Sequence, residues 1–87
     1  MGCLANISGK EAVRALSKIG YVIRREGSHM ILYNDRHGYP ILVIPDHKEL
    51  APALLRAQIK RAGLSVDDFL VLVKYLIRSL KLLLYHC

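Results

Sequence analysis

The triplet Gly27-Ser28-His29 lies between two short apolar runs and carries the residues of this chain best suited to chemistry. Histidine has an ordinary pKa of about 6.5, so its imidazole both takes up and releases protons near neutral pH. Glycine tolerates backbone turns that other residues resist, and it lets a ligand approach the main chain closely. A histidine at the start of a strand, directly after a turn, is therefore a candidate general base or acid. From the residues alone, a purely structural histidine at a strand start is the open alternative.

Other side chains that could share this chemistry are few. His47 follows the end of a predicted strand and is a candidate second proton-transfer group, although a role in stabilising the turn explains it slightly better. His37, in a predicted turn, and His86, near the C-terminus, are interpreted as incidental. Ser28 and His29 are not expected to form a nucleophile–base pair, because adjacent residues on a strand point to opposite faces.

The charge of the chain predicts a polyanionic partner. Thirteen lysines and arginines stand against seven acids, for a formal net charge of +6. Nucleic acid, or an acidic protein that masks the charge, fits this excess, and a merely soluble basic surface is the alternative. The candidate nucleic-acid contacts are Arg24, Arg25, Lys48, Arg56, Lys60 and Arg61, with Tyr33 as a ring that could stack on a base. Because Arg24 and Arg25 are neighbours in a strand, only one is expected on the face that carries His29.

Length and composition predict a single domain. The chain has 87 residues, of which 53% are hydrophobic, enough for one core without a metal or disulfide framework. Cys3 and Cys87 stand at opposite ends without CxxC spacing, so we expect free thiols in a reducing cytoplasm. No signal peptide is apparent. The histidines lack the i, i+4 spacing or acidic partner of a typical metal site, so neither a metal nor another cofactor is expected.

A helix is predicted near the N-terminus. Ser8 and Glu11 match a capping box, in which each residue satisfies a backbone N–H of the first turn. Val13 and Leu16 then recur at helical spacing, and Gly20 ends the helix as a left-handed stop.

Three short strands are expected next, over residues 21–26, 28–34 and 40–45. In the second strand, His29, Ile31 and Tyr33 share one face. Such short connections predict an antiparallel meander, because parallel strands need a long crossover. The prolines that bracket the third strand predict an edge position or a strand end.

Two helices complete the pattern. Pro52 suits the first turn of one helix, and Ser65 is a candidate N-cap of the next. The last helix, about residues 66–85, is apolar apart from one basic stripe, and it is too short and too often charged to span a membrane. We expect it to dock on the domain or on another protein. The order α-β-β-β-α-α predicts an α+β fold of two layers, in which helices cover one face of a small sheet.

Four segments also occur in an informative order, namely Gly20-Tyr21, Gly27-Ser28-His29, Pro45-x-His47 and Ala62-Gly63-Leu64-Ser65. This ordered set resembles the HicA toxin family of bacterial and archaeal toxin–antitoxin systems, over about residues 8 to 70. The resemblance implies a fold like a double-stranded-RNA-binding domain, a metal-independent endoribonuclease activity on mRNA and a HicB-type antitoxin as partner. The catalytic histidine of the family falls on His29.

Two features depart from the family pattern. Many members carry Gly-Thr-Leu where this chain has Ala53-Leu54-Leu55, at the head of the helix that begins near Pro52. The apolar tail beyond Leu70 has no counterpart in the pattern. We therefore expect one HicA-like domain over residues 1–87, with a core of about residues 8–70 and a C-terminal helical extension of about residues 66–85.

With this resemblance, the leading hypothesis is a cytoplasmic toxin ribonuclease of a stress response. His29 would transfer the proton of a 2′-hydroxyl, while Gly27 and Ser28 would position backbone and phosphate. One alternative is a non-catalytic RNA-binding module of the same fold. Another is a protein-interaction domain, or a homo-oligomer, that works through the apolar C-terminal helix. No membrane association is expected.

Overall fold

The computed structural model of the chain describes residues 4–82, and the side chains of residues 4–74. Its elements in chain order are α1 (Gly9–Ser17), β1 (Tyr21–Arg25), β2 (His29–Asn34), β3 (Leu42–Pro45), α2 (Pro52–Arg61) and α3 (Val66–Leu82). The predicted strands are all present, with bounds that differ by no more than two residues. Cys3, His86 and Cys87, on which predictions were made, lie outside the described residues.

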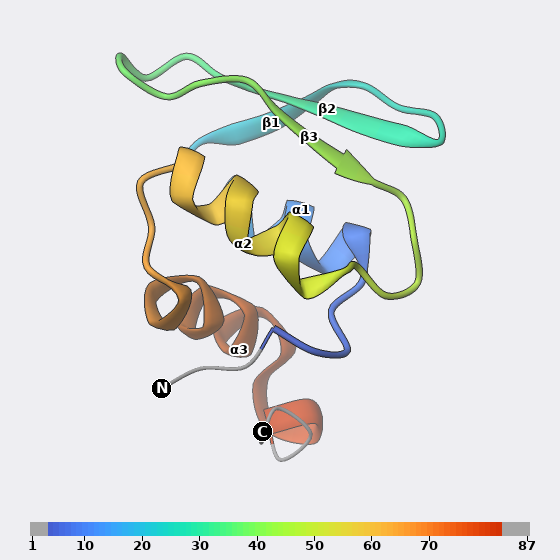
Figure 1. Cartoon of the computed structure of the whole chain (residues 1–87). Helices are drawn as coiled ribbons and strands as arrows, with labels where there is room; N and C mark the ends of the chain where they lie inside the picture. The colour runs from blue at the N-terminus through green and yellow to red at the C-terminus, as the bar shows by residue number, and fades with distance from the viewer. Residues whose placement is uncertain (1–3, 83–87) are drawn as a thin grey trace.

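The three strands form an antiparallel meander in the order β1-β2-β3. The predicted topology is therefore confirmed, and β3, which ends at Pro45, is an edge strand as its prolines indicated. The helices α1 and α2 pack against one face of this sheet, and the two-layer α+β core is confirmed (Figure 1).

The additional helix α3 lies on the far side of α1 and α2, away from the sheet (Figure 1). Phe69, Leu70 and Val73 are buried in the core, so this part of the helix docks on its own domain. No helix among the described residues is long and apolar enough to cross a membrane. The side chains beyond residue 74, on which a homo-oligomer through this helix depends, lie outside the described part.

Local hydrogen bonds explain where the helices begin. Ser8 Oγ accepts from the N–H of Glu11 at 3.0 Å, and Glu11 Oε1 accepts from the N–H of Ser8 at 3.0 Å, which confirms the capping box. Pro52 occupies the first turn of α2, where its missing N–H costs no hydrogen bond. Ser65 Oγ accepts from the N–H of Asp68 at 3.0 Å and caps α3.

Burial along β2 alternates and separates the two faces of the sheet. Met30, Leu32 and Asn34 are buried beneath the helices, whereas His29 is exposed and the next alternate residues are partly so. The predicted common face of His29, Ile31 and Tyr33 is therefore confirmed. We call the side of the sheet opposite the helices the open face, since no described helix or strand covers it (Figure 1).

The start of α1 packs tightly against the chain that follows β3. Gly9 is buried, and a Cβ atom at this position would overlap the carbonyl oxygen of Pro45. Its N–H donates to the carbonyl of His47 at 2.9 Å. The absence of a side chain at Gly9 thus lets the helix anchor the segment 45–47, which lies next to the start of β2.

Candidate functional site

His29 is the first residue of β2, and its side chain is exposed. In the sheet it lies opposite Pro45 of β3. The carbonyl of the preceding residue, Ser28, accepts from the N–H of Asp46 at 3.0 Å. The end of β3 therefore holds the main chain around the histidine in place, while the imidazole stays in solvent. A fixed backbone with an accessible ring is what a proton-transfer group requires.

The hydroxyl of Ser28 lies close to the imidazole of His29. Ser28 Oγ is 3.2 Å from His29 Nδ1, within hydrogen-bonding distance. The prediction that the two side chains point apart is wrong, because β2 begins only at His29 and Ser28 lies in the bend before it, where strand alternation does not apply. Among the described residues Nε2 makes no hydrogen bond, so this nitrogen is the one available to a substrate.

Gly27 lies in the bend that joins β1 to β2, as predicted, but it does not need the backbone freedom of glycine there. Positive φ angles occur at Gly20, Gly38 and Gly63, but not at Gly27. A Cβ atom built on Gly27 would meet nothing within 4 Å. The fold itself therefore does not require glycine here, and the main chain beside His29 is open to a ligand.

The loop after β3 brings His47 into the same region. Its neighbour Asp46 is hydrogen-bonded to Ser28, and the His47 carbonyl is held by the N–H of Gly9. The side chain of His47 is exposed. The two histidines predicted to share the chemistry thus come from adjoining segments at one end of the sheet.

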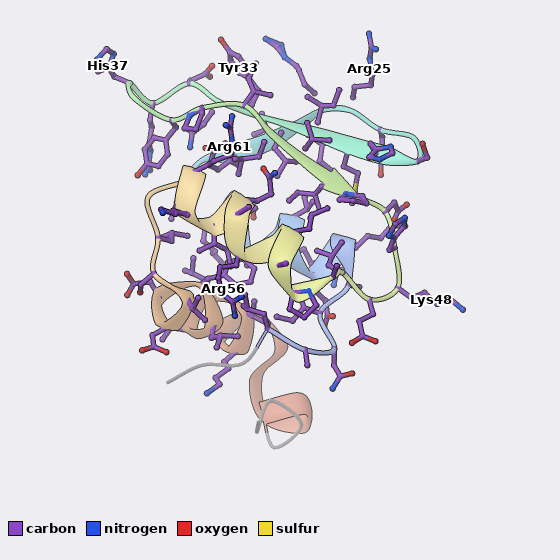
Figure 2. The ribbon with its side chains drawn as sticks, in the orientation of Figure 1. Arg25, Tyr33, His37, Lys48, Arg56 and Arg61 are labelled. Atoms are coloured by element: carbon purple, nitrogen blue, oxygen red, sulfur yellow. The ribbon has the colours of Figure 1, made fainter. Side chains whose placement is uncertain are left out.

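Arg24 and Arg25 both lie on the open face, so the prediction that alternation separates them is wrong. The pairing of β1 with β2 shifts between Ile23 and Arg25, which places Arg25 opposite Ile31. The guanidinium carbon of Arg24 lies 4.6 Å from the centroid of the Tyr33 ring. The shift in pairing between Ile23 and Arg25 has the character of a β-bulge, which sets two consecutive residues of one strand against one residue of the partner strand. Figure 2 shows Arg25 and Tyr33 on the side of the sheet away from the helices.

The other predicted basic residues do not join this group. Arg61, at the end of α2, donates through Nη2 to the carbonyl of Ile41 at 3.0 Å and so braces the helix against the sheet. Arg56 lies away from the sheet, and Lys48 extends from the loop after β3 (Figure 2). Lys60 is an exposed residue of α2. The predicted phosphate contacts therefore occupy several surfaces and not a single track.

Exposed apolar side chains on the open face were not recognised from the sequence. Val22 lies opposite Tyr33 and is 56% exposed, and Val43 lies opposite Ile31 and is 41% exposed. They could have been found from their positions opposite Tyr33 and Ile31, but those positions are known only once the strand pairing is known. None of the three strands contains an acidic residue. Among the described residues, no three His, Cys, Asp or Glu side chains gather as a metal site needs.

The sequence was compared with known protein families and with curated proteins. A family whose sequence model is described as the HicA toxin of bacterial toxin–antitoxin systems matches residues 9–64. This span contains α1, the three strands, α2 and the triplet Gly27-Ser28-His29, and it ends before α3. No match was found among curated proteins.

Proposed function

The chain belongs to the HicA toxin family, and from this premise we propose that it is a metal-independent endoribonuclease that cleaves mRNA with His29 as its catalytic residue. The observation that carries the proposal is the setting of that histidine. Its main chain is held by β3, its Nδ1 faces Ser28 Oγ at 3.2 Å, and its ring is exposed on the same face as two arginines.

Cleavage of RNA without a metal begins at the 2′-hydroxyl. His29 Nε2 takes the proton of this hydroxyl, and the oxygen attacks the adjacent phosphorus in line. The bond from phosphorus to the 5′-oxygen breaks, which leaves a 2′,3′-cyclic phosphate and a 5′-hydroxyl once the leaving oxygen is protonated. A well-placed general base contributes about 10²–10⁴-fold to such a rate. DNA lacks the attacking hydroxyl, so the mechanism selects RNA.

Neighbouring groups have distinct parts in this mechanism. The Ser28 hydroxyl orients the imidazole through Nδ1. The unobstructed main chain at Gly27 lets a phosphate approach the backbone. Arg25 supplies positive charge on the same face, where charge develops on the phosphoryl oxygens. His47, whose main chain is held in the adjoining loop, is the candidate to protonate the leaving 5′-oxygen.

We assign neutralisation of the toxin to a HicB-type antitoxin. The family belongs to toxin–antitoxin systems, which implies an antitoxin as partner. An acidic antitoxin complements the net charge of +6, and the exposed Val22 and Val43 offer it apolar contact area on the open face. Cleavage of mRNA places the toxin in the cytoplasm.

Growth of a bacterial host tests this function. Production of the parent chain is expected to arrest growth, and His29→Ala to abolish the arrest. His37→Ala is the matched control, because His37 is exposed and lies at the far tip of the β2–β3 hairpin (Figure 2). Equal toxicity of His29→Ala and the parent, at equal protein levels, would overturn the proposal.

A further inference from the structure

The open face carries a planar cation that lies over an aromatic ring. The guanidinium carbon of Arg24 lies 4.6 Å from the centroid of Tyr33, close enough for a cation–π contact. Tyr33 is half-buried near the end of the central strand β2, whereas Arg24 is exposed. The ring thus lies on one side of the guanidinium group, and the exposed Arg24 side chain remains in contact with solvent.

Arg24 forms no ion pair among the described residues. None of the three strands contains an acidic residue, and neither Glu26, which directly follows β1, nor any other carboxylate among the described residues forms an ion pair with this guanidinium. Arg25, the next residue, adds a second positive charge on the same face. The planar guanidinium of Arg24 can stack on a flat ring, and the charge of Arg25 can contact an anion. An unpaired nucleotide supplies both a flat ring and a negative charge.

We propose that the Arg24–Tyr33 stack is a base-binding platform that makes this protein bind single-stranded RNA in preference to duplex RNA. A base stacks on the free side of the Arg24 guanidinium, and Arg25 contacts a neighbouring phosphate. This inference deepens the proposed ribonuclease function and rests on it. In a duplex the bases are stacked on each other, so the platform has no base face to receive.

The platform is well placed relative to the catalytic histidine. Tyr33 and His29 lie on the same face of β2, four residues apart, which corresponds to about 13 Å along the strand. A nucleotide on the platform therefore lies a few positions from the scissile bond in an extended strand. Its capture would align the RNA along β2 toward His29.

Binding without cleavage provides the test. All proteins carry His29→Ala, and the probes are a 12-nucleotide single-stranded RNA, the same strand in a duplex, and the same strand with abasic nucleotides. Arg24→Lys keeps the positive charge but removes the planar guanidinium group. Tyr33→Leu removes the aromatic ring over which Arg24 lies. Arg14→Lys is the matched control, because Arg14 is an exposed arginine of α1. Circular dichroism of each variant verifies the fold.

We expect Arg24→Lys and Tyr33→Leu to weaken binding to the intact single strand by about five-fold or more. The salt dependence is expected to keep its slope in Arg24→Lys, since the number of cations is unchanged. Binding of the abasic strand and the duplex, already weaker in the reference protein, is expected to change little. Arg14→Lys is expected to bind all three probes like the reference.

Two results would overturn the inference. One is a reference protein that binds the duplex or the abasic strand as tightly as the intact strand. The other is binding of the intact single strand by Arg24→Lys and Tyr33→Leu at the affinity of the reference protein. If these variants have then lost affinity for the antitoxin, the Arg24–Tyr33 contact belongs to a protein interface. A failure of the catalytic assignment appears separately, as RNA cleavage by His29→Ala, and 2′-O-methyl probes, which lack the attacking hydroxyl, then allow binding to be measured without cleavage.

Discussion

The carbonyl oxygen of Ser28 accepts a hydrogen bond from the N–H of Asp46 at 3.0 Å, between the residue that precedes His29 and the residue that follows its strand partner Pro45. The start of β2 and the end of β3 are thereby joined just where the candidate catalytic side chain leaves the sheet. The N–H of Gly9 holds the same segment one residue further on, through the carbonyl of His47. The position of His29 therefore depends on a small set of main-chain contacts.

Gly9→Ala is expected to destabilise the protein by about 1–3 kcal/mol, because the new Cβ atom would overlap the carbonyl oxygen of Pro45. A shift of α1 would also disturb the segment that holds Ser28, so RNA cleavage should fall as well. Urea denaturation measures the first effect. Unchanged stability would show that α1 does not need its close contact with the end of β3.

Gly27→Ala is expected to lower RNA cleavage without lowering the stability of the protein. The φ angle at Gly27 is not positive and a Cβ atom meets nothing within 4 Å, so the free energy of unfolding should be unchanged or raised by up to about 1 kcal/mol. Cleavage should fall by roughly ten-fold or more, because the methyl group obstructs the approach of a phosphate to the main chain. Cleavage at the parental rate would refute the assignment of this backbone to substrate binding.

Ser28→Ala removes the hydroxyl that faces His29 Nδ1 at 3.2 Å. Loss of one hydrogen bond of about 0.5–1.5 kcal/mol in the transition state lowers the cleavage rate by about 2- to 13-fold. The unfolding midpoint should stay close to that of the parent, because Ser28 is exposed. Single-turnover kinetics detect the difference, and a rate equal to the parental one would mean that the hydroxyl does not orient the ring.

Ionisation of Tyr21 is expected to lower the stability of the folded protein at alkaline pH. Its hydroxyl donates to the Pro40 carbonyl at 2.7 Å, and burial raises the pKa of Tyr21 above its ordinary value of 10.0. The unfolded chain therefore ionises first, so the free energy of unfolding is fully retained below about pH 10 and falls as the pH rises beyond it. Tyr21→Phe should lower the free energy of unfolding by about 0.5–1.5 kcal/mol at pH 8. Between pH 8 and pH 11 that free energy should fall less in Tyr21→Phe than in the parent. Denaturation at both pH values measures this, and equal declines would exclude Tyr21 as the cause.

Features that depend on local hydrogen bonds could be predicted from the sequence. The capping box at Ser8 and Glu11 and the cap at Ser65 involve residues three positions apart, and the structure has both. The meander followed from the short connections, and the position of His29 at the head of β2 followed from the pattern around it. These signals need no knowledge of distant segments.

Features that depend on strand pairing could not be predicted in this way. The bulge at Arg24 places two arginines on one face, and it arises from how β1 registers with β2. The contact between Ser28 and His29 depends on the residue at which pairing with β3 begins. The hydrogen bond from Arg61, a predicted phosphate contact, to the Ile41 carbonyl likewise forms only once α2 is packed on the sheet.

Single-turnover cleavage of RNA by the purified protein tests the role of His29 most directly. The rate is measured with a metal chelator present, for the parent, His29→Ala and His37→Ala, on a single-stranded RNA whose cleavage site has been mapped. The parent and His37→Ala are expected to cleave equally fast, and His29→Ala about 10²- to 10⁴-fold more slowly with an unchanged melting temperature. A 2′-deoxy nucleotide at the cleaved position should block the reaction. Cleavage by His29→Ala at the parental rate would contradict the assignment of His29 as the catalytic residue.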